Sequence, residues 1–179
     1  MAGKEKIDLS LLSIIPLTHK KLLKGAFPDE DKDFSHLINF FKTVCVLDQR
    51  DRKSRTYLAI YKDQVVGYLT ISTGFLEGEL SGVKSSSTFN YQVLVLGKLY
   101  IVPNYRGSGI GQKLLRFVVD IAHDFDNMTG CLGIQVDSNI DKNTIAFYKN
   151  FGFEEFDEQD EEEQTVKMFF LLPHKTIDP

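Results

Sequence analysis

The sequence predicts an α/β or α+β fold in which helices flank a mixed β-sheet. Three observations indicate this class. Runs rich in β-branched and aromatic residues occur before, between and after segments of helical periodicity. The longest such run, Tyr91 to Val102, leads straight into a glycine-rich turn. That turn opens an amphipathic helix, marked by apolar residues from Ile110 to Phe125. With 179 residues, 42% of them hydrophobic and 26% charged, the chain fits one domain spanning residues 1–179.

Local patterns predict the elements of the first half. An apolar run with a proline near its end is typical of an edge strand, and a short capped helix is expected after it. Apolar residues at helical spacing then predict one amphipathic helix. Two strand-like runs separated by Lys62-Asp63-Gln64 predict a hairpin. In order, these segments are Ser10–Leu17, Thr18–Leu23, Asp33–Leu47, Thr56–Tyr61 and Val65–Ser72.

The second half alternates loops, strands and helices. Gly, Ser and Glu are frequent in Gly74–Asn90, where we expect a long loop or an irregular strand edge. Tyr91–Val102 is too β-branched for a helix and predicts a central strand. Beyond the long helix we expect a strand, a short helix ended by a glycine, and a final strand. These last segments are Cys131–Val136, Asp141–Asn150 and Thr165–Leu172.

Composition argues against several classes of protein. No apolar run approaches the roughly 18–20 residues that span a membrane. The first residues do not resemble a secretory signal, so we expect a cytoplasmic protein without membrane association. Cys45 and Cys131 form no CxxC pair, which predicts two small buried residues and neither a disulfide nor a metal site.

The net charge of −4 is a local feature. Eight of the 25 acidic residues lie in Glu154–Glu163, which leaves 17 acids against 21 Lys and Arg in the rest of the chain. Such a run is typical of a solvated loop. It would alternatively form an acidic rim that attracts a cationic substrate, and it argues against nucleic acid binding nearby.

The glycine-rich turn carries the clearest chemical signal. Gly107, Gly109 and Gly111 stand at every second position, so each can adopt a positive φ and bring backbone amides close to a ligand. The start of a helix adds unpaired N–H groups and a partial positive charge. Arg106 adds a full positive charge at the mouth. This combination predicts a site for phosphate or pyrophosphate.

Two familiar phosphate loops do not fit the turn, and a third does. The P-loop needs GxxxxGK[ST], and the dinucleotide fingerprint GxGxxG fails at Gln112. The pattern [RQ]xxGxG is satisfied by Arg106, Gly109 and Gly111, and here the sequence resembles the GNAT superfamily of acyl-CoA-dependent N-acyltransferases. A later segment, Ala146–Phe153, is similar to the family's short helix ending in Tyr-x-x-x-Gly-Phe.

The resemblance implies a fold and a donor. Acetyl-CoA would lie in the gap between two splayed parallel strands, here Tyr91–Val102 and Cys131–Val136. Its pantetheine would pair with the backbone of the first strand, and its pyrophosphate would bind the glycine loop. One of two asparagines would face the cofactor, because the family's usual position holds Asp141 here. The implied contacts are Tyr100, Ile101, Val102, Arg106, Gly107, Ser108, Gly109, Ile110, Gly111, Asn139 and Asn143.

In this family the acetyl group passes directly to a primary amine, and the sequence shows no GxSxG-type nucleophile. The resemblance points to Tyr148 as the general acid that protonates the departing thiolate. The alternative for Tyr148 is an aromatic core residue. Glu77, Glu79 or water would act as the base, because Lys98 occupies the stretch where many relatives place a carboxylate.

The acceptor remains open between an unspecified amine and a nucleic acid. Arg52–Leu58, Gly67-Tyr68 and Leu96–Leu99 look like the GNAT toxins of toxin–antitoxin pairs, which acetylate aminoacyl-tRNA. In that alternative Arg50, Arg52, Lys53 and Arg55 would contact RNA phosphates; otherwise no nucleic acid partner is expected. A third alternative is an acetyl-CoA-binding module without turnover. Pairing of exposed sheet edges would give a homodimer, which no residue of the sequence decides.

Overall fold

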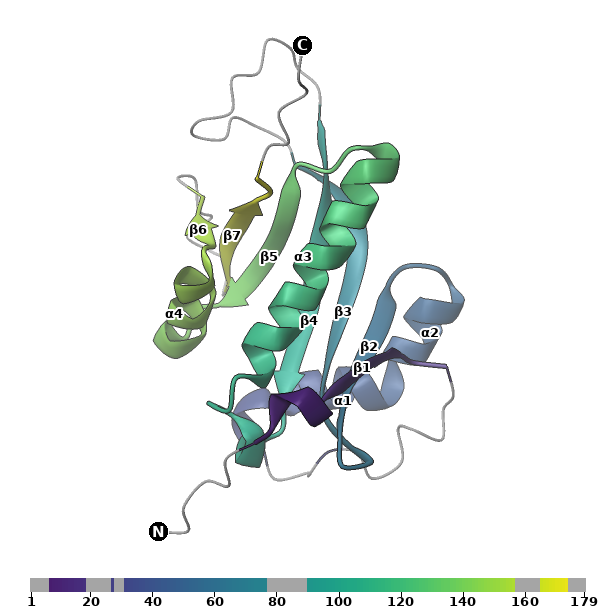
Figure 1. Cartoon of the computed structure of the whole chain (residues 1–179), viewed down its shortest axis with the longest axis vertical. Helices are drawn as coiled ribbons and strands as arrows, with labels where there is room; N and C mark the ends of the chain where they lie inside the picture. Colours follow the sequence, from purple (N-terminus) through teal and green to yellow (C-terminus); the bar gives the residue numbers. More distant parts are fainter. Residues whose placement is uncertain (1–6, 19–26, 28–30, 77–89, 157–164, 174–179) are drawn as a thin grey trace. The chain divides into compact units, whose positions relative to one another are not determined.

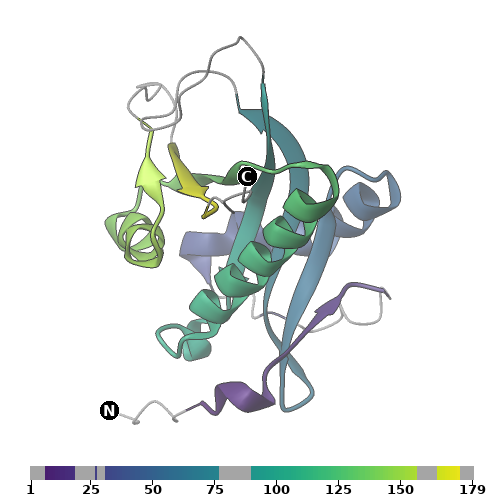
Figure 2. The ribbon, with the colours of Figure 1, turned by 45° about the horizontal axis from the view of Figure 1, so that its top comes forward.

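The computed structural model describes residues 7–18, 27, 31–76, 90–156 and 165–173. The chain forms two compact units, which are described separately: Met1–Ser72 with Gly97–Phe117, and Thr73–Leu96 with Val118–Pro179. Within the described residues, seven strands form one mixed sheet in the order β1-β2-β3-β4-β5-β7-β6, and strands β3 and β4 run through both units. The predicted mixed sheet with flanking helices is therefore confirmed (Figures 1 and 2).

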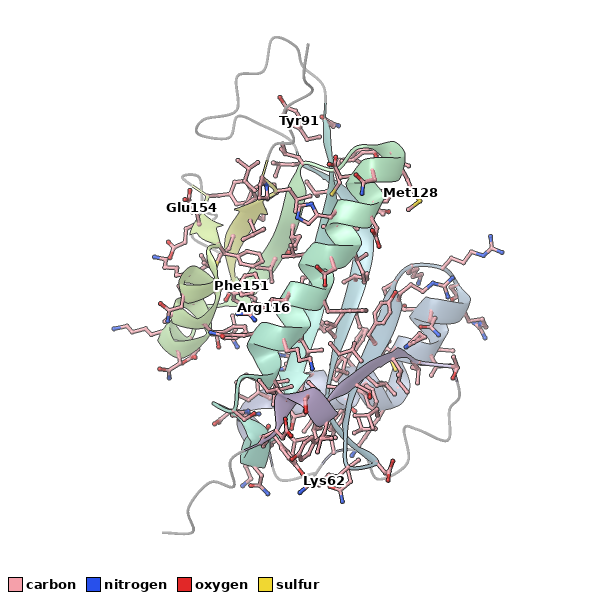
Figure 3. All side chains as sticks on the ribbon, viewed as in Figure 1. Lys62, Tyr91, Arg116, Met128, Phe151 and Glu154 are labelled. Atoms are coloured by element: carbon pink, nitrogen blue, oxygen red, sulfur yellow. The ribbon has the colours of Figure 1, made fainter. Side chains whose placement is uncertain are left out.

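The first unit begins with the predicted edge strand and hairpin. β1 pairs antiparallel with β2, and β2 pairs antiparallel with β3. Lys62 and Asp63 connect β2 to β3, and both have positive φ (48° and 63°), as a tight two-residue hairpin turn requires. Lys62 lies at the tip of this hairpin (Figure 3). The elements are η1 (Leu9–Leu11), β1 (Ser13–Pro16), η3 (Lys32–Phe34), α1 (Ser35–Thr43), α2 (Cys45–Arg50), β2 (Arg55–Tyr61) and β3 (Gln64–Leu76).

The prediction of a single helix over Asp33–Leu47 is wrong. A short 3-10 turn comes first, and two helices, α1 and α2, meet at Val44, whose φ of −109° departs from helical geometry. Side chains on either side of the break compete for backbone acceptors. The Thr43 hydroxyl donates to Asn39 O at 2.7 Å, and the Cys45 thiol donates to Phe41 O at 2.8 Å. Such bonds to carbonyls four residues back bend or interrupt helices.

The rest of the chain follows the predicted alternation. β4 and β5 are parallel, with Leu94–Leu96 paired to Ile134–Val136, and β7 is antiparallel to β5. Strands β6 and β7 lie beside α4 in both views (Figures 1 and 2). The elements are β4 (Tyr91–Ile101), η4 (Pro103–Tyr105), α3 (Ile110–Thr129), β5 (Gly133–Asn139), α4 (Lys142–Phe151), β6 (Glu154–Glu155) and β7 (Thr165–Leu171).

Two segments differ from expectation in the second unit. β3 continues to Leu76, beyond its expected end at Ser72 and into Gly74–Asn90, where a long loop or an irregular strand edge was expected. The acidic run does not begin in a loop, because Glu154 and Glu155 form β6 and pair with Phe169 and Met168 of β7. Both glutamates remain exposed, so pairing uses their backbone and leaves their charges in water. Residues 157–163 of the run, and the helix expected at 18–23 beyond Thr18, lie outside the described residues.

Each unit has its own apolar cluster. In the first unit, aromatic residues of α1, β3 and β4 pack around Phe27; in the second, Leu76, Val93 and Phe169 pack together. Cys45 and Cys131 are buried and free, as predicted, and burial raises the pKa of Cys45 to about 11. Among the described residues, no helix is long and apolar enough to cross a membrane, and no three His, Cys, Asp or Glu side chains form a group that could hold a metal ion.

Burial raises the pKa of three tyrosines, Tyr68, Tyr100 and Tyr148, well above the ordinary value near ~10. Tyr68 is fully buried in the first unit, where its hydroxyl donates a hydrogen bond to Leu37 O at 2.7 Å. In the unfolded chain these phenols ionise near pH ~10, whereas the folded protein keeps them protonated. The folded state therefore holds more protons above pH ~10, and stability falls as the pH rises from there.

We expect Tyr68→Phe to reduce this alkaline loss of stability. Below pH ~10 the variant is about 1 kcal/mol less stable, because the hydrogen bond to Leu37 O is lost. Above pH ~10 the wild type loses about 1.4 kcal/mol per pH unit more than the variant, because only its unfolded chain releases a proton from residue 68. Urea unfolding at several pH values measures both effects. Parallel stability curves for the two proteins would contradict the assignment.

Candidate functional site

The predicted strand–loop–helix unit is formed in the first unit by β4, η4 and the start of α3. The chain leaves β4 through a 3-10 turn, in which Arg106 N donates to Pro103 O at 3.1 Å. Gly107 and Gly109 follow with φ values of 77° and 90°, which other residues rarely adopt. Gly111 already lies inside α3 and has no positive φ, so two of the three glycines, and not all three, are required by backbone conformation.

The loop presents a row of unpaired backbone donors. Within the described part of the chain, the six consecutive N–H groups from Gly107 to Gln112 donate to no acceptor. The first paired amide is Lys113 N, which donates to Gly109 O at 3.1 Å. The Ser108 hydroxyl turns back to donate to Tyr105 O at 2.6 Å. Six adjacent donors at the N-terminus of a 20-residue helix form the electropositive backbone site that phosphate groups bind.

The structure pairs the positive charge of Arg106, which was expected at the mouth of the loop, with a carboxylate. Arg106 Nη2 forms an ion pair with Asp31 Oδ2, and its Nε donates to Ile101 O at 3.0 Å. Its guanidinium also lies 4.4 Å from the centre of the Phe34 ring. The side chain thus connects the loop to the end of β4 and to the segment before α1.

Asp31 is the residue that sequence reasoning missed. It accepts hydrogen bonds from both Arg106 and Tyr100, the latter at 2.8 Å, and its side chain is only 7% exposed. In the sequence it is one of four acids between positions 29 and 33, a pattern typical of a solvated turn. No local signal separates it from its neighbours.

The three expected pantetheine contacts, Tyr100, Ile101 and Val102, do not all direct their backbone groups to the same side. Val102 N–H is bonded to Val66 O of β3 at 3.0 Å. Tyr100 O also faces β3, since a Cβ placed on Gly67 would lie 2.6 Å from it. Because successive residues of a strand direct their backbone groups to opposite sides, the N–H of Ile101 points away from β3. Ile101 is therefore the one of the three whose amide does not face β3.

The start of α3 is also held by the N-terminal segment. Lys113 Nζ donates to the carbonyl oxygens of Leu9 and Leu12, the second at 3.3 Å. A Cβ placed on Gly109 would lie 3.1 Å from Leu9 Cδ1, so η1 closely approaches the glycine loop. No pattern in the sequence indicates this contact, because a lysine in the first turns of a helix is normally a solvated residue.

Tyr148 lies in the second unit, on α4. Asp141 caps this helix by accepting from Thr144 N at 2.9 Å, and Gly152 ends it with a φ of 115°. The Tyr148 ring is 5% exposed and packs edge-on against Phe153, with ring centres 5.3 Å apart. Burial raises the pKa of its hydroxyl, which has no hydrogen-bond partner among the described residues.

The remaining candidates are placed as follows. Asn139 ends β5 opposite Thr165, and Asn143 lies in the first turn of α4; both are exposed. Lys98 Nζ lies 5.9 Å from the centre of the Phe40 ring, in the first unit. Glu77 and Glu79 lie outside the described residues.

The basic segment after α1 carries acids of its own. Arg50 Nε lies 2.8 Å from Asp51 Oδ1, and Lys53 Nζ lies 3.9 Å from Asp48 Oδ1. Arg52 and Arg55 are exposed and form no ion pair within the described ranges. Two of the four cations are thus partly compensated by described acids, and two are not.

Comparisons with known proteins agree with this geometry. The sequence model of the Acetyltransferase (GNAT) family matches residues 18–153. No curated protein matches the sequence. Among solved structures, AtaT complexed with acetyl-methionyl-tRNAfMet is similar (22% identity, TM-score 0.69, covering 89% of this chain and 94% of that one). So is a Tyr-to-Phe variant of the toxin AtaT bound to the C-terminus of the antitoxin AtaR and acetyl-CoA (23%, 0.67, 88% and 92%).

A third solved structure is a Tyr-to-Phe variant of KacT, with 22% identity, a TM-score of 0.72, and coverage of 89% of this chain and 95% of that one. At these identities the solved structures establish the fold. The family match carries more, because it spans well over half of the residues and includes both the glycine loop and Tyr148. The chain therefore belongs to the GNAT family of acetyltransferases.

Proposed function

We propose that this acetyltransferase uses acetyl-CoA to acetylate the amino group of an aminoacyl-tRNA, and that residues 1–179 form a single acetyltransferase domain. The observation that carries the donor assignment is the row of six amides from Gly107 to Gln112, which are unpaired within the described residues. A pyrophosphate supplies the acceptor oxygens that these donors lack. The AtaT structure with bound acetyl-CoA supports the choice of donor.

The donor is held by backbone groups of the first unit. Gly107, Ser108, Gly109, Ile110 and Gly111 donate amides to the pyrophosphate, and Ile101 offers the outward amide of β4 to the pantetheine or to the thioester oxygen. Arg106 contributes through its backbone and through the position of the loop. Asn139 and Asn143, both exposed beside the N-terminal end of α4, are candidates for the outer part of the cofactor.

Transfer is direct. The amine nitrogen attacks the thioester carbonyl carbon, the carbon–sulfur bond breaks, and Tyr148 protonates the departing thiolate before solvent restores its own proton. A free thiol has a pKa near ~8.5, below that of a phenol. Burial raises the pKa of thiols and phenols alike, here that of Cys45 to about 11 and that of Tyr148 as well. A buried thiolate is therefore a much stronger proton acceptor than a thiolate in water.

The acceptor amine is protonated near neutral pH and must first lose a proton. On β4, Lys98 stands where a carboxylate would be the simplest base, and a cation cannot accept that proton. Water, or Glu77 or Glu79 in the segment after β3, is left to accept it.

The aminoacyl-tRNA acceptor rests on two supports. AtaT, a similar structure, is complexed with acetyl-methionyl-tRNAfMet. In this chain, Arg52 and Arg55 are exposed cations on the segment between α2 and β2, and no described acid compensates them. Exposed arginines suit the phosphates of a polynucleotide. A small amine is positively charged near neutral pH, so exposed arginines would repel it.

Alanine substitutions at two glycines test the donor site. Gly109 and Gly130 have nearly equal φ values, 90° and 86°, so each substitution costs about 1 kcal/mol of stability. A Cβ at Gly130 would meet nothing within 4 Å. Gly109 lies in the proposed phosphate loop, and a Cβ there would lie 3.1 Å from Leu9 Cδ1 of η1. We expect Gly109→Ala alone to weaken acetyl-CoA binding in calorimetric titration. Equal affinity in both variants would argue that the loop does not hold the pyrophosphate.

Removal of the Tyr148 hydroxyl tests the proton donor. We expect Tyr148→Phe to lower kcat by about 100-fold with little change in acetyl-CoA affinity, because one general acid is lost and the ring stays packed. Tyr91→Phe is the matched control, since it removes a hydroxyl from a half-buried tyrosine of the same unit (Figure 3). A Tyr148→Phe enzyme that turns over normally would leave Tyr148 as a core residue.

Competition between acceptors tests the substrate class. We expect labelled acetyl groups to pass from acetyl-CoA to aminoacyl-tRNA, and not to polyamines or lysine peptides. Arg52→Ala with Arg55→Ala should reduce kcat/KM for the tRNA by about tenfold and flatten its salt dependence, since two phosphate contacts are lost. Donor affinity should not change. Acetylation of small amines with no transfer to aminoacyl-tRNA would overturn the tRNA assignment and leave the enzyme class intact.

A further inference from the structure

Asp31 is a nearly buried carboxylate that the catalytic chemistry does not use. Its side chain is 7% exposed, and its Oδ2 accepts from two donors, the Tyr100 hydroxyl at 2.8 Å and the Arg106 guanidinium. A carboxylate removed from water is costly unless it is paired and hydrogen-bonded. Both partners lie at the end of β4 or in the loop that follows it, so Asp31 is stable only when those segments are in place.

Arg106 is the residue through which Asp31 reaches the loop. Its guanidinium is held by three groups of the first unit: the Asp31 carboxylate, the Ile101 carbonyl at the end of β4, and the Phe34 ring of η3. The next residue, Gly107, begins the row of amides that bond no described acceptor. The contacts of the Arg106 guanidinium therefore act at the residue from which the glycine loop starts.

We propose that Asp31 is a positioning residue for donor binding. By holding the Arg106 side chain in place, Asp31 sets the geometry of the Gly107–Gln112 amides. In this arrangement the charge of Arg106 is neutralised by Asp31, and the loop amides bind the pyrophosphate. This inference rests on the proposed acetyl-CoA site and adds a residue from a distant part of the sequence to it.

Because the donor is negatively charged, the direction in which its affinity changes when Asp31 is replaced tests this inference. The phosphates of acetyl-CoA are negative, so removing a nearby negative charge strengthens binding if electrostatics alone act. Removing Asp31 also releases Arg106, which strengthens binding again if the guanidinium is a direct phosphate ligand. Loss of the positioning contact has the opposite effect: it weakens acetyl-CoA binding, because the amides are no longer held in their binding geometry.

The experiment compares acetyl-CoA affinity in Asp31→Asn and Asp33→Asn. Asp33 is exposed, lies two residues away in η3, and loses the same charge without touching Arg106. We expect about tenfold weaker binding in Asp31→Asn, the loss typical of one charge-assisted hydrogen bond, and equal or slightly tighter binding in Asp33→Asn. Thermal unfolding confirms that both variants are folded at the assay temperature.

A donor without a pyrophosphate separates positioning from general damage. Acetyl-pantetheine has no phosphates, so kcat/KM measured with it should be the same in wild type and Asp31→Asn. With acetyl-CoA, KM should rise while kcat and the acceptor KM stay constant. If Asp31→Asn does not fold, Arg106→Lys replaces it: a lysine keeps the positive charge but cannot bond Asp31 and Ile101 O together. If Asp31 positions the loop through Arg106, Arg106→Lys also binds acetyl-CoA more weakly than wild type.

The outcomes are distinct. Equal or tighter acetyl-CoA binding by folded Asp31→Asn, or equal losses with both donors, overturns the positioning role while the acetyl-CoA site stands. Absence of acetyl-CoA binding in wild type and Asp33→Asn alike overturns the proposed function itself. Selective weakening with acetyl-CoA in Asp31→Asn supports the inference.

Discussion

A carboxylate held away from water determines much of the first unit. Asp31 needs the hydroxyl of Tyr100 and the guanidinium of Arg106, and these two groups come from the end of β4 and from the loop beyond it. Arg106 in turn needs the Ile101 carbonyl and the face of Phe34. Each group satisfies the others, and together they leave the amides of the glycine loop without acceptors in the described part of the chain. Around the loop, these described side chains are paired with one another, and the loop amides bond none of them.

Burial acts differently at Tyr148. There the ring is enclosed by the aromatic residues of its own motif, Phe147 and Phe153, and the hydroxyl has no hydrogen-bond partner among the described residues. Burial raises the pKa of the phenol, which therefore stays protonated near neutral pH and bonds no described group. The packing is that of an ordinary core residue and it also keeps the hydroxyl protonated, so this environment is compatible both with a core role and with the proposed general acid.

The sequence was informative where the determinants are local. The hairpin turn, the central strand, the glycine loop, α3, and the glycine that ends α4 each depend on residues within a few positions of one another, and all were predicted. The break at Val44 was not, because it depends on Thr43 and Cys45 side chains competing with the backbone. β6 was not, because strand pairing with β7 overrode the charge pattern of Glu154 and Glu155. Asp31 and the Lys113 contact were missed because their partners lie far away in sequence.

The supports of the glycine loop have a consequence for how the chain acquires its structure. The bonds from Tyr100 and Arg106 to Asp31 span 69 and 75 residues, and the bond from Lys113 to Leu9 spans 104. Contacts at such separations close large loops of chain and form late, after local helices and hairpins. During synthesis, Leu9 and Asp31 are made well before these partners, which follow only after more than half of the 179 residues. The glycine loop is therefore local in sequence, but its order is a property of the completed unit.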